Sequence, residues 1–123
     1  MLNQSKIIAL IATQNPEAAT KFYEQTLGLR LVADEPFAIV FDANGTMLRL
    51  QKVESFQPQP FTTLGWEVAN IEATMAQLAE KGVQFEQFPG LPLDDHGIMT
   101  FADGAKVAWF KDLDGNLLSL TQP

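Results

Sequence analysis

The chain carries one pattern twice, NPEAATKFYEQTLGLRLV at residues 15–32 and NIEATMAQLAEKGVQFE at residues 70–86. In each copy an asparagine precedes a helical segment with an apolar stripe, a glycine ends that segment, and alternating strand-like residues follow. The two copies begin about 55 residues apart. A repeat of this length predicts two similar units, each with an apolar face that a neighbouring element must cover.

The flanking residues indicate an α+β fold of two tandem βαβββ modules. Asn15 is expected to cap the first helix with its side chain, and Gly28 to end it; Asn70 and Gly82 are expected to do the same for the second. Asn44-Gly45 is a strong signal for a tight hairpin turn. Strands are predicted at Lys6–Thr13, Leu29–Ala33, Phe37–Asp42, Thr46–Val53, Thr63–Val68, Val83–Phe88, Ile98–Phe101, Lys106–Lys111 and Leu117–Thr121.

We therefore expect a single domain over residues 1–123, with one module at about 1–53 and the other at about 62–123. A segment with two prolines and no periodicity, ESFQPQPF at about residues 54–61, links them.

Composition excludes several classes of protein. The chain has 46% hydrophobic residues, no cysteine and a formal net charge of −7. No apolar run approaches the ~20 residues of a membrane span, and no secretory signal is visible. Because the lysines and arginines are few and scattered, we expect no nucleic-acid partner and no membrane partner. A cytoplasmic protein is the expectation.

Three segments carry a resemblance to a known family: AATKFYEQTLGL at residues 18–29, GWEVANI at residues 65–71 and FKDLDGNLLSL at residues 110–120. With the order of elements, they resemble the vicinal oxygen chelate superfamily, which includes glyoxalases, extradiol dioxygenases and bleomycin-resistance proteins. The resemblance implies that the two modules form a curved, mostly antiparallel half-barrel around a small-molecule pocket. It also implies a homodimer.

Enzymes of that superfamily hold a divalent metal through His, Glu or Gln at four strand positions, two in each module. By the resemblance these positions fall on Ile8, Arg49, Thr63 and Ser119. Isoleucine has no lone pair, the guanidinium is a permanent cation without acceptor atoms, and the two hydroxyls are weak ligands. We therefore expect no metal, no cofactor and no catalytic residue of the family type.

The residues expected to bind a ligand are Ile8, Arg49, Thr63, Glu67, His96, Trp109 and Ser119. Arg49 has two interpretations, a structural ion pair with Glu67 or an anchor for a carboxylate or phosphate. Trp109 is either a stacking wall or core packing. His96 lies either at the lip of the pocket or in a solvated loop.

The leading hypothesis is a protein that binds a small organic molecule without a metal. The sequence leaves open whether the chain is an enzyme. One alternative is a metal-dependent lyase, isomerase or dioxygenase whose unorthodox site uses Glu67, His96 and a nearby aspartate. Another is a structural or regulatory module whose groove takes a peptide or a second subunit.

Overall fold

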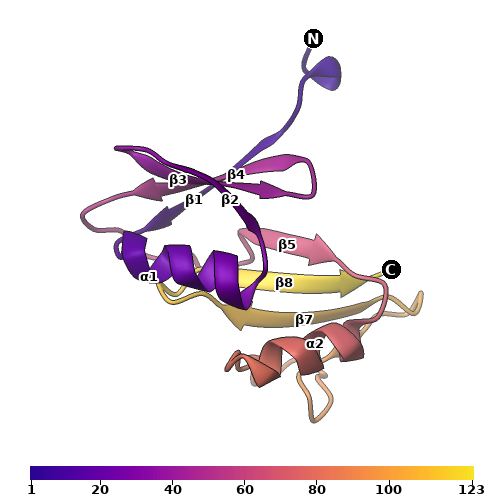
Figure 1. Cartoon of the computed structure of the whole chain (residues 1–123). Helices are drawn as coiled ribbons and strands as arrows, with labels where there is room; N and C mark the ends of the chain where they lie inside the picture. The colour runs from indigo at the N-terminus through magenta and orange to yellow at the C-terminus, as the bar shows by residue number, and fades with distance from the viewer. The chain divides into compact units, whose positions relative to one another are not determined.

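A computed structural model describes all residues from Met1 to Pro123. The chain divides into two units, Met1–Pro58 and Gln59–Pro123, and each is described by itself. The boundary lies inside the proline-containing segment expected to link the modules. Both units have the same order of elements, a strand, a helix and three further strands (Figure 1). The prediction of two tandem βαβββ modules is therefore confirmed.

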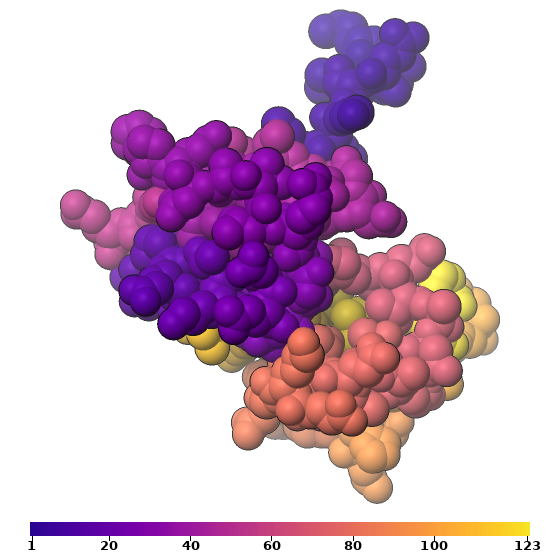
Figure 2. Space-filling model, in the orientation of Figure 1, coloured from indigo at the N-terminus to yellow at the C-terminus, as the bar shows by residue number.

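The first unit is a four-stranded sheet with one helix. Its elements are η1 (Leu2–Gln4), β1 (Ile8–Thr13), α1 (Pro16–Lys21), η2 (Phe22–Thr26), β2 (Arg30–Asp34), β3 (Ala38–Ala43) and β4 (Thr46–Lys52). The strand order is β1-β4-β3-β2. β1 is parallel to β4, and the other two pairs are antiparallel. The segment with η1 stands away from the rest of this unit and is fully exposed (Figure 2).

The second unit repeats this plan. Its elements are β5 (Leu64–Glu67), α2 (Ile71–Glu80), β6 (Met99–Thr100), β7 (Lys106–Lys111) and β8 (Leu117–Gln122). The strand order β5-β8-β7-β6 matches that of the first sheet, with β5 parallel to β8 and the remaining pairs antiparallel. No helix of the chain is both long and apolar enough to span a membrane.

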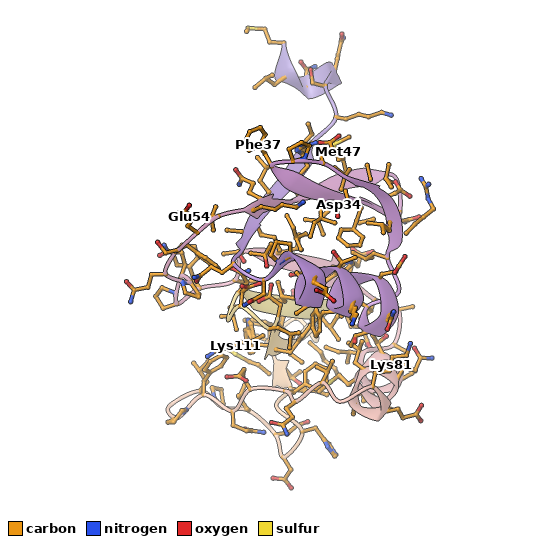
Figure 3. All side chains as sticks on the ribbon, turned by 60° about the vertical axis from the view of Figure 1, so that its left-hand side comes forward. Asp34, Phe37, Met47, Glu54, Lys81 and Lys111 are labelled. Carbon is orange, nitrogen blue, oxygen red and sulfur yellow. The ribbon has the colours of Figure 1, made fainter.

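Strand alternation gives each sheet two different faces. In the first unit Leu48 and Leu50 are 1% exposed and lie on the same face as Phe41, against which Tyr23 packs with 5.9 Å between ring centroids. Met47 alternates with them and lies on the side of the sheet away from α1 (Figure 3). The predicted apolar face toward the helix is thus observed.

The second unit buries its core in the same way. Phe110 and Leu118 are fully buried and paired across β7 and β8. α2 packs on these two strands with Ile71, Met75 and Leu78 buried. Trp66 stacks on Phe110 with 6.5 Å between ring centroids, which extends the apolar layer to β5.

The predicted strand Val83–Phe88 is wrong as a continuous strand. Only Phe85 forms a bridge, opposite Phe110, and the Glu86 amide donates to the Trp109 carbonyl at 2.8 Å. The edge of the second sheet is instead shared between this short contact and β6, which pairs further along β7. The loop that separates the two pieces of edge contains His96.

The helix starts differ between the modules. Asn70 Oδ1 accepts from the Ala73 amide at 3.0 Å, as predicted. The Asn15 side chain makes no such cap, so that prediction is wrong. Thr13, at the buried end of β1, instead accepts from the Asn15 amide through its hydroxyl at 3.1 Å.

Candidate functional site

The four positions expected from the resemblance occupy equivalent places in the two sheets. On β1 and β4, Leu10 is opposite Arg49, and Ile8 lies two residues earlier. On β5 and β8, Gly65 is opposite Ser119, and Thr63 lies two residues before Gly65. Each pair is therefore on one face of its own sheet, the face away from the helix, with the same offset.

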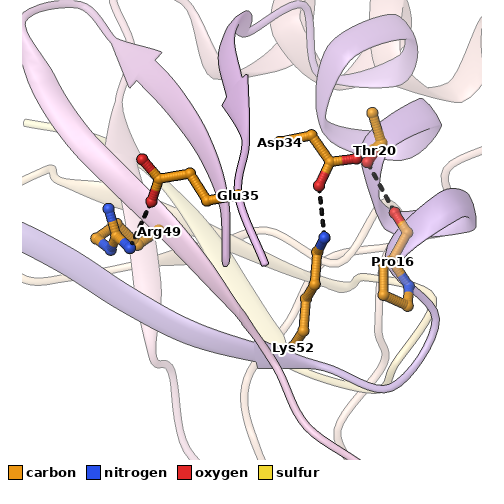
Figure 4. A network of polar contacts seen from close by, with 6 residues as sticks. All are labelled: Pro16, Thr20, Asp34, Glu35, Arg49 and Lys52. Carbon is orange, nitrogen blue, oxygen red and sulfur yellow. Dashed lines mark hydrogen bonds and ion pairs between the residues drawn. The ribbon is translucent and has the colours of Figure 1, made fainter. Parts of the chain in front are cut away.

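Arg49 has a partner within the first unit, but this partner is not the one predicted. Its Nη2 donates to Glu35 Oε1 at 2.9 Å, and the Arg49 side chain is 29% exposed (Figure 4). The pair with Glu67, which belongs to the second unit, stays a prediction. The sequence hid the observed partner because Glu35 follows an edge strand whose register is shifted by a bulge between Leu31 and Ala33.

A second ion pair, between Lys52 and Asp34, lies along the same strands (Figure 4). In both pairs the acid lies at the end of β2 or directly after it, and the base lies on β4. Two consecutive acidic residues at the end of the edge strand β2 thus form ion pairs with two basic residues of β4. Pairs this exposed contribute little stability each, about 0–1 kcal/mol, but the pair with Glu35 orients the Arg49 side chain.

The exposed face of the first sheet is largely apolar. Ile8, Leu10 and Met47 are 50%, 55% and 41% exposed. A cavity of about 390 Å³ opens on this face. Its lining includes Lys6, Ile8, Arg30, Val32, Val40 and Met47. Lys6, Arg30 and Val32 were not among the expected site residues. The alternation of side chains along β2 could have placed Arg30 and Val32 on this face.

Charge at this cavity is positive on balance. Arg30 Nη2 lies 3.7 Å from Asp42 Oδ2, an exposed pair that leaves Arg30 70% accessible. Lys6 adds a second cation to the lining, whereas Asp42 is its one acidic member. The first unit therefore offers an apolar depression with two basic groups in its lining.

In the second unit, the expected residues Thr63, Glu67, Trp109 and Ser119 share one face, because Ser119 pairs with both Gly65 and Trp109. Thr63 donates its hydroxyl to the Leu117 carbonyl at 3.3 Å. Ser119 is 8% exposed, and its Oγ lies 2.6 Å from where a Cβ on Gly65 would be. Glu67 is exposed.

Trp109 is held in place on this face. Its Nε1 donates to Thr62 Oγ1 at 3.1 Å. Phe88 packs against it edge to face, with 5.6 Å between ring centroids and 73° between the rings. The indole is therefore held at both its polar and its apolar side.

His96 lies elsewhere. It lines a separate cavity with Met75, Ala79 and Phe85, on the α2 side of the second sheet. Phe85 packs on Phe110, which faces α2, so the sheet separates His96 from Ser119. His96 therefore lies at a different cavity from the one that the other expected residues of this unit would line.

The residues at the four family positions do not suit a divalent ion. The Arg49 cation is engaged by Glu35, Ile8 has no donor atom, and the Thr63 hydroxyl bonds a carbonyl. Nowhere in the chain do three or more His, Cys, Asp or Glu side chains gather in a way that could hold a metal. Glu67 and His96 accordingly form no such group.

The comparisons with known proteins agree with the fold. No curated protein matches the sequence significantly. A glyoxalase/bleomycin resistance protein/dioxygenase superfamily member from Sphaerobacter thermophilus has a TM-score of 0.76 at 23% identity, covering 100% of both chains. A glyoxalase family protein from Enterococcus faecalis has a TM-score of 0.76 at 23% identity, covering 98% of this chain and 99% of the other.

A lactoylglutathione lyase from Agrobacterium tumefaciens is similar at a TM-score of 0.73 and 14% identity, covering 96% of this chain and 93% of the other. At these sequence identities, similarity to the solved structures establishes the fold and nothing more. The sequence profile of one family, however, matches residues 7–120. This chain belongs to the Glyoxalase/Bleomycin resistance protein/Dioxygenase superfamily.

Proposed function

We propose that the chain binds a small organic molecule on the exposed face of its sheets, and that it does so without a metal ion. The observation that carries this proposal is the chemistry of the four family positions. A guanidinium paired with a carboxylate stands at one of them, and Ile8, Thr63 and Ser119 stand at the others. The guanidinium would repel a divalent cation, and the alkyl side chain of Ile8 has no lone pair to coordinate one.

The first unit supports a particular class of ligand. Apolar side chains line the cavity on its exposed sheet face, together with Lys6 and Arg30. An apolar body would replace water over the side chains of Ile8 and Met47. An anionic group would be favoured by the two cations. The proposed ligand is therefore an apolar molecule that carries a carboxylate, phosphate or sulfonate.

Arg49 then has a supporting role. Glu35 already engages one of its nitrogens, and the guanidinium has five N–H donors in all. The ion pair holds the side chain along the sheet, where its remaining donors can face a ligand that lies over Leu10 and Val40. An ion pair with Glu35 and a role toward a ligand are therefore compatible for Arg49.

In the second unit, Thr63, Glu67, Trp109 and Ser119 remain proposed ligand-binding residues. The support for Trp109 is its fixed position between Thr62 and Phe88, which would let a flat ligand stack without ordering the indole first. The alternative of a metal-dependent enzyme built on Glu67 and His96 has no comparable support, because these residues do not gather into a metal-binding group.

A fluorescent probe of the proposed ligand class, an apolar molecule with one anionic group, tests the proposal. 8-Anilinonaphthalene-1-sulfonate has an apolar aromatic body and one sulfonate. We expect it to bind the folded protein saturably, with the same affinity in the presence and absence of EDTA. Met47→Glu should weaken binding, because it places a negative charge among the lining side chains.

Thr46→Glu is the matched control. Thr46 is the exposed neighbour of Met47 on β4, and alternation points it to the opposite face of the sheet. It should leave the affinity unchanged. Equal weakening by both variants would show that only net charge matters, and loss of binding in EDTA would show that a metal takes part. Either outcome would contradict the proposed function.

A further inference from the structure

The second unit contains a cavity that the proposed function does not use. It has a volume of about 270 Å³ and lies between α2 and the loop that carries His96. Met75, Phe85 and Ile98 provide apolar walls, while Glu72 and His96 provide polar atoms. Because Phe85 and Met75 are on the α2 side of the sheet, this cavity is separated by the sheet from Trp109 and Ser119.

The loop that forms one wall is internally braced. Asp94 Oδ1 accepts from the His96 amide and from the Ile98 amide, both at 2.9 Å. Gln87 Nε2 donates to the Asp94 carbonyl at 3.3 Å and so ties the turn to the preceding segment. Gly97 has a φ of +93°, and a Cβ there would lie 3.0 Å from the Glu86 carbonyl oxygen. The wall is thus formed before any ligand arrives.

The opposite wall is a helix face with small side chains. Ala76 and Ala79 of α2 lie one turn apart and leave the space that larger residues would fill. Met75, beside them, is 6% exposed and adapts readily to the shape of an apolar guest. A cavity with small, aromatic and thioether walls suits a phenyl-sized apolar group.

Glu72 is the acidic residue of the lining, and Lys106 and Asp94 lie near it. Glu72 Oε1 accepts from Lys106 Nζ at 3.0 Å, which engages this lysine. The hydrogen bond to Lys106 lowers the pKa of Glu72, while nearby Asp94 acts in the opposite direction. Hydrogen bonds from the Ile98 and His96 amides lower the pKa of Asp94. Two carboxyl groups, each with a lowered pKa, thus lie beside one lysine.

We propose that this cavity is a second binding site, specific for a small molecule with an apolar ring or chain and a protonated amine. The apolar part would lie between Ala76, Ala79 and Phe85, and the ammonium group would lie beside the Glu72 carboxylate. The ligand class is opposite in charge to that proposed for the first unit, and the two sites share no lining residue.

Two probes with the same apolar part separate the charge requirement from simple hydrophobic binding. They are 2-phenylethylammonium and 3-phenylpropanoate, each a phenyl group on a two-carbon chain. We expect amide shifts in the NMR spectrum to saturate at α2 and at Ile98 with the ammonium probe only. For a probe of this size the dissociation constant should be on the order of 1–10 mM.

Three variants locate the site. Glu72→Gln should weaken binding of the ammonium probe by up to about fivefold, the upper end of the effect of losing one exposed charge pair. Ala76→Leu should abolish the saturable shifts because the new side chain occupies the cavity. Ala73→Leu is the control, since Ala73 is an exposed residue of the same helix outside the cavity and leucine is nearly as good a helix former. It should bind the probe like the original chain.

The proposal would be overturned if neither probe saturates, if the phenylpropanoate binds as tightly as the ammonium probe, or if Ala76→Leu and Ala73→Leu behave alike. Thermal unfolding of each variant establishes that it is folded. Because the sulfonate probe of the first unit reports on other residues, failure here would leave that result unaffected.

Discussion

The turn from Asp112 to Asn116 allows a test of how the second sheet is held together. Asp112 is 6% exposed, and its Oδ1 accepts from the Asp114 amide at 3.0 Å and the Asn116 amide at 2.9 Å. Its Oδ2 accepts from Asn116 Nδ2 at 2.8 Å. One buried carboxylate thus organises the turn that joins β7 to β8, and we predict that Asp112→Ala is strongly destabilising.

The magnitude follows from the donors that lose this acceptor. Asn116 is 4% exposed, so water reaches its amide and its side-chain nitrogen poorly. Each buried donor left without its acceptor costs about 1–3 kcal/mol. Two such donors give an expected loss of about 2–6 kcal/mol in the free energy of unfolding, a large share of the ~5–15 kcal/mol typical of a folded domain.

The chain contains a matched control for this substitution. Asp103 forms a similar turn, in which its Oδ1 accepts from the Ala105 amide at 3.0 Å, but Asp103 is exposed. Water can replace that carboxylate, so Asp103→Ala should cost no more than about 1 kcal/mol. Asp112→Asn should fall between the two alanine variants, since it keeps one acceptor oxygen and presents an amide to Asn116 Nδ2.

Urea unfolding followed by circular dichroism measures all three variants, and equal slopes would establish that the same two states are compared. A cost for Asp112→Ala that is within about 0.5 kcal/mol of the cost for Asp103→Ala would refute the reasoning, because burial is what distinguishes the two turns.

Three further predictions follow from other parts of the chain. Leu50→Ala should cost about 2–5 kcal/mol in the free energy of unfolding and Leu10→Ala under about 1 kcal/mol, because only Leu50 faces the buried layer; equal costs in urea unfolding would contradict the assignment of faces. The hydrogen bond from the Ile98 amide is the first cause of the lowered pKa of Asp94. The ionised carboxylate therefore stabilises the fold at pH values above its ordinary pKa near 4. This stabilisation is lost as the pH falls through the lowered pKa. Between about pH 4 and pH 2, the melting temperature of Asp94→Ala should therefore fall by less than that of the original chain. A larger fall for the variant than for the original chain would be evidence against the loop geometry. We also propose a homodimer, which sedimentation equilibrium should show as twice the 13.6 kDa chain mass; a mass of one chain at high concentration would exclude it.

Local signals in the sequence were enough to predict most of the fold. Asn44 has a φ of 50° and Gly45 a φ of 93°, the conformations that a tight hairpin turn between β3 and β4 requires. Gly82 likewise has a positive φ where α2 was expected to end. These features depend on a few consecutive residues, so a single sequence reports them well.

The partners in the candidate site could be predicted only in part. Alternation placed Ile8 and Arg49 on one face, because side-chain direction in a strand repeats every two residues. The partner of Arg49 depends on how β2 pairs with β3, and the bulge in β2 cannot be read from periodicity. The position of His96 depends on a long loop, whose path tertiary contacts decide.

The absence of a metal requirement is the central claim, and metal analysis tests it most directly. Protein purified without added metal should contain far less than one equivalent of zinc, nickel, manganese or iron per chain. Its melting temperature and its affinity for the sulfonate probe should not change in millimolar EDTA. One tightly bound ion per chain, with a melting temperature that falls when EDTA removes it, would contradict the account.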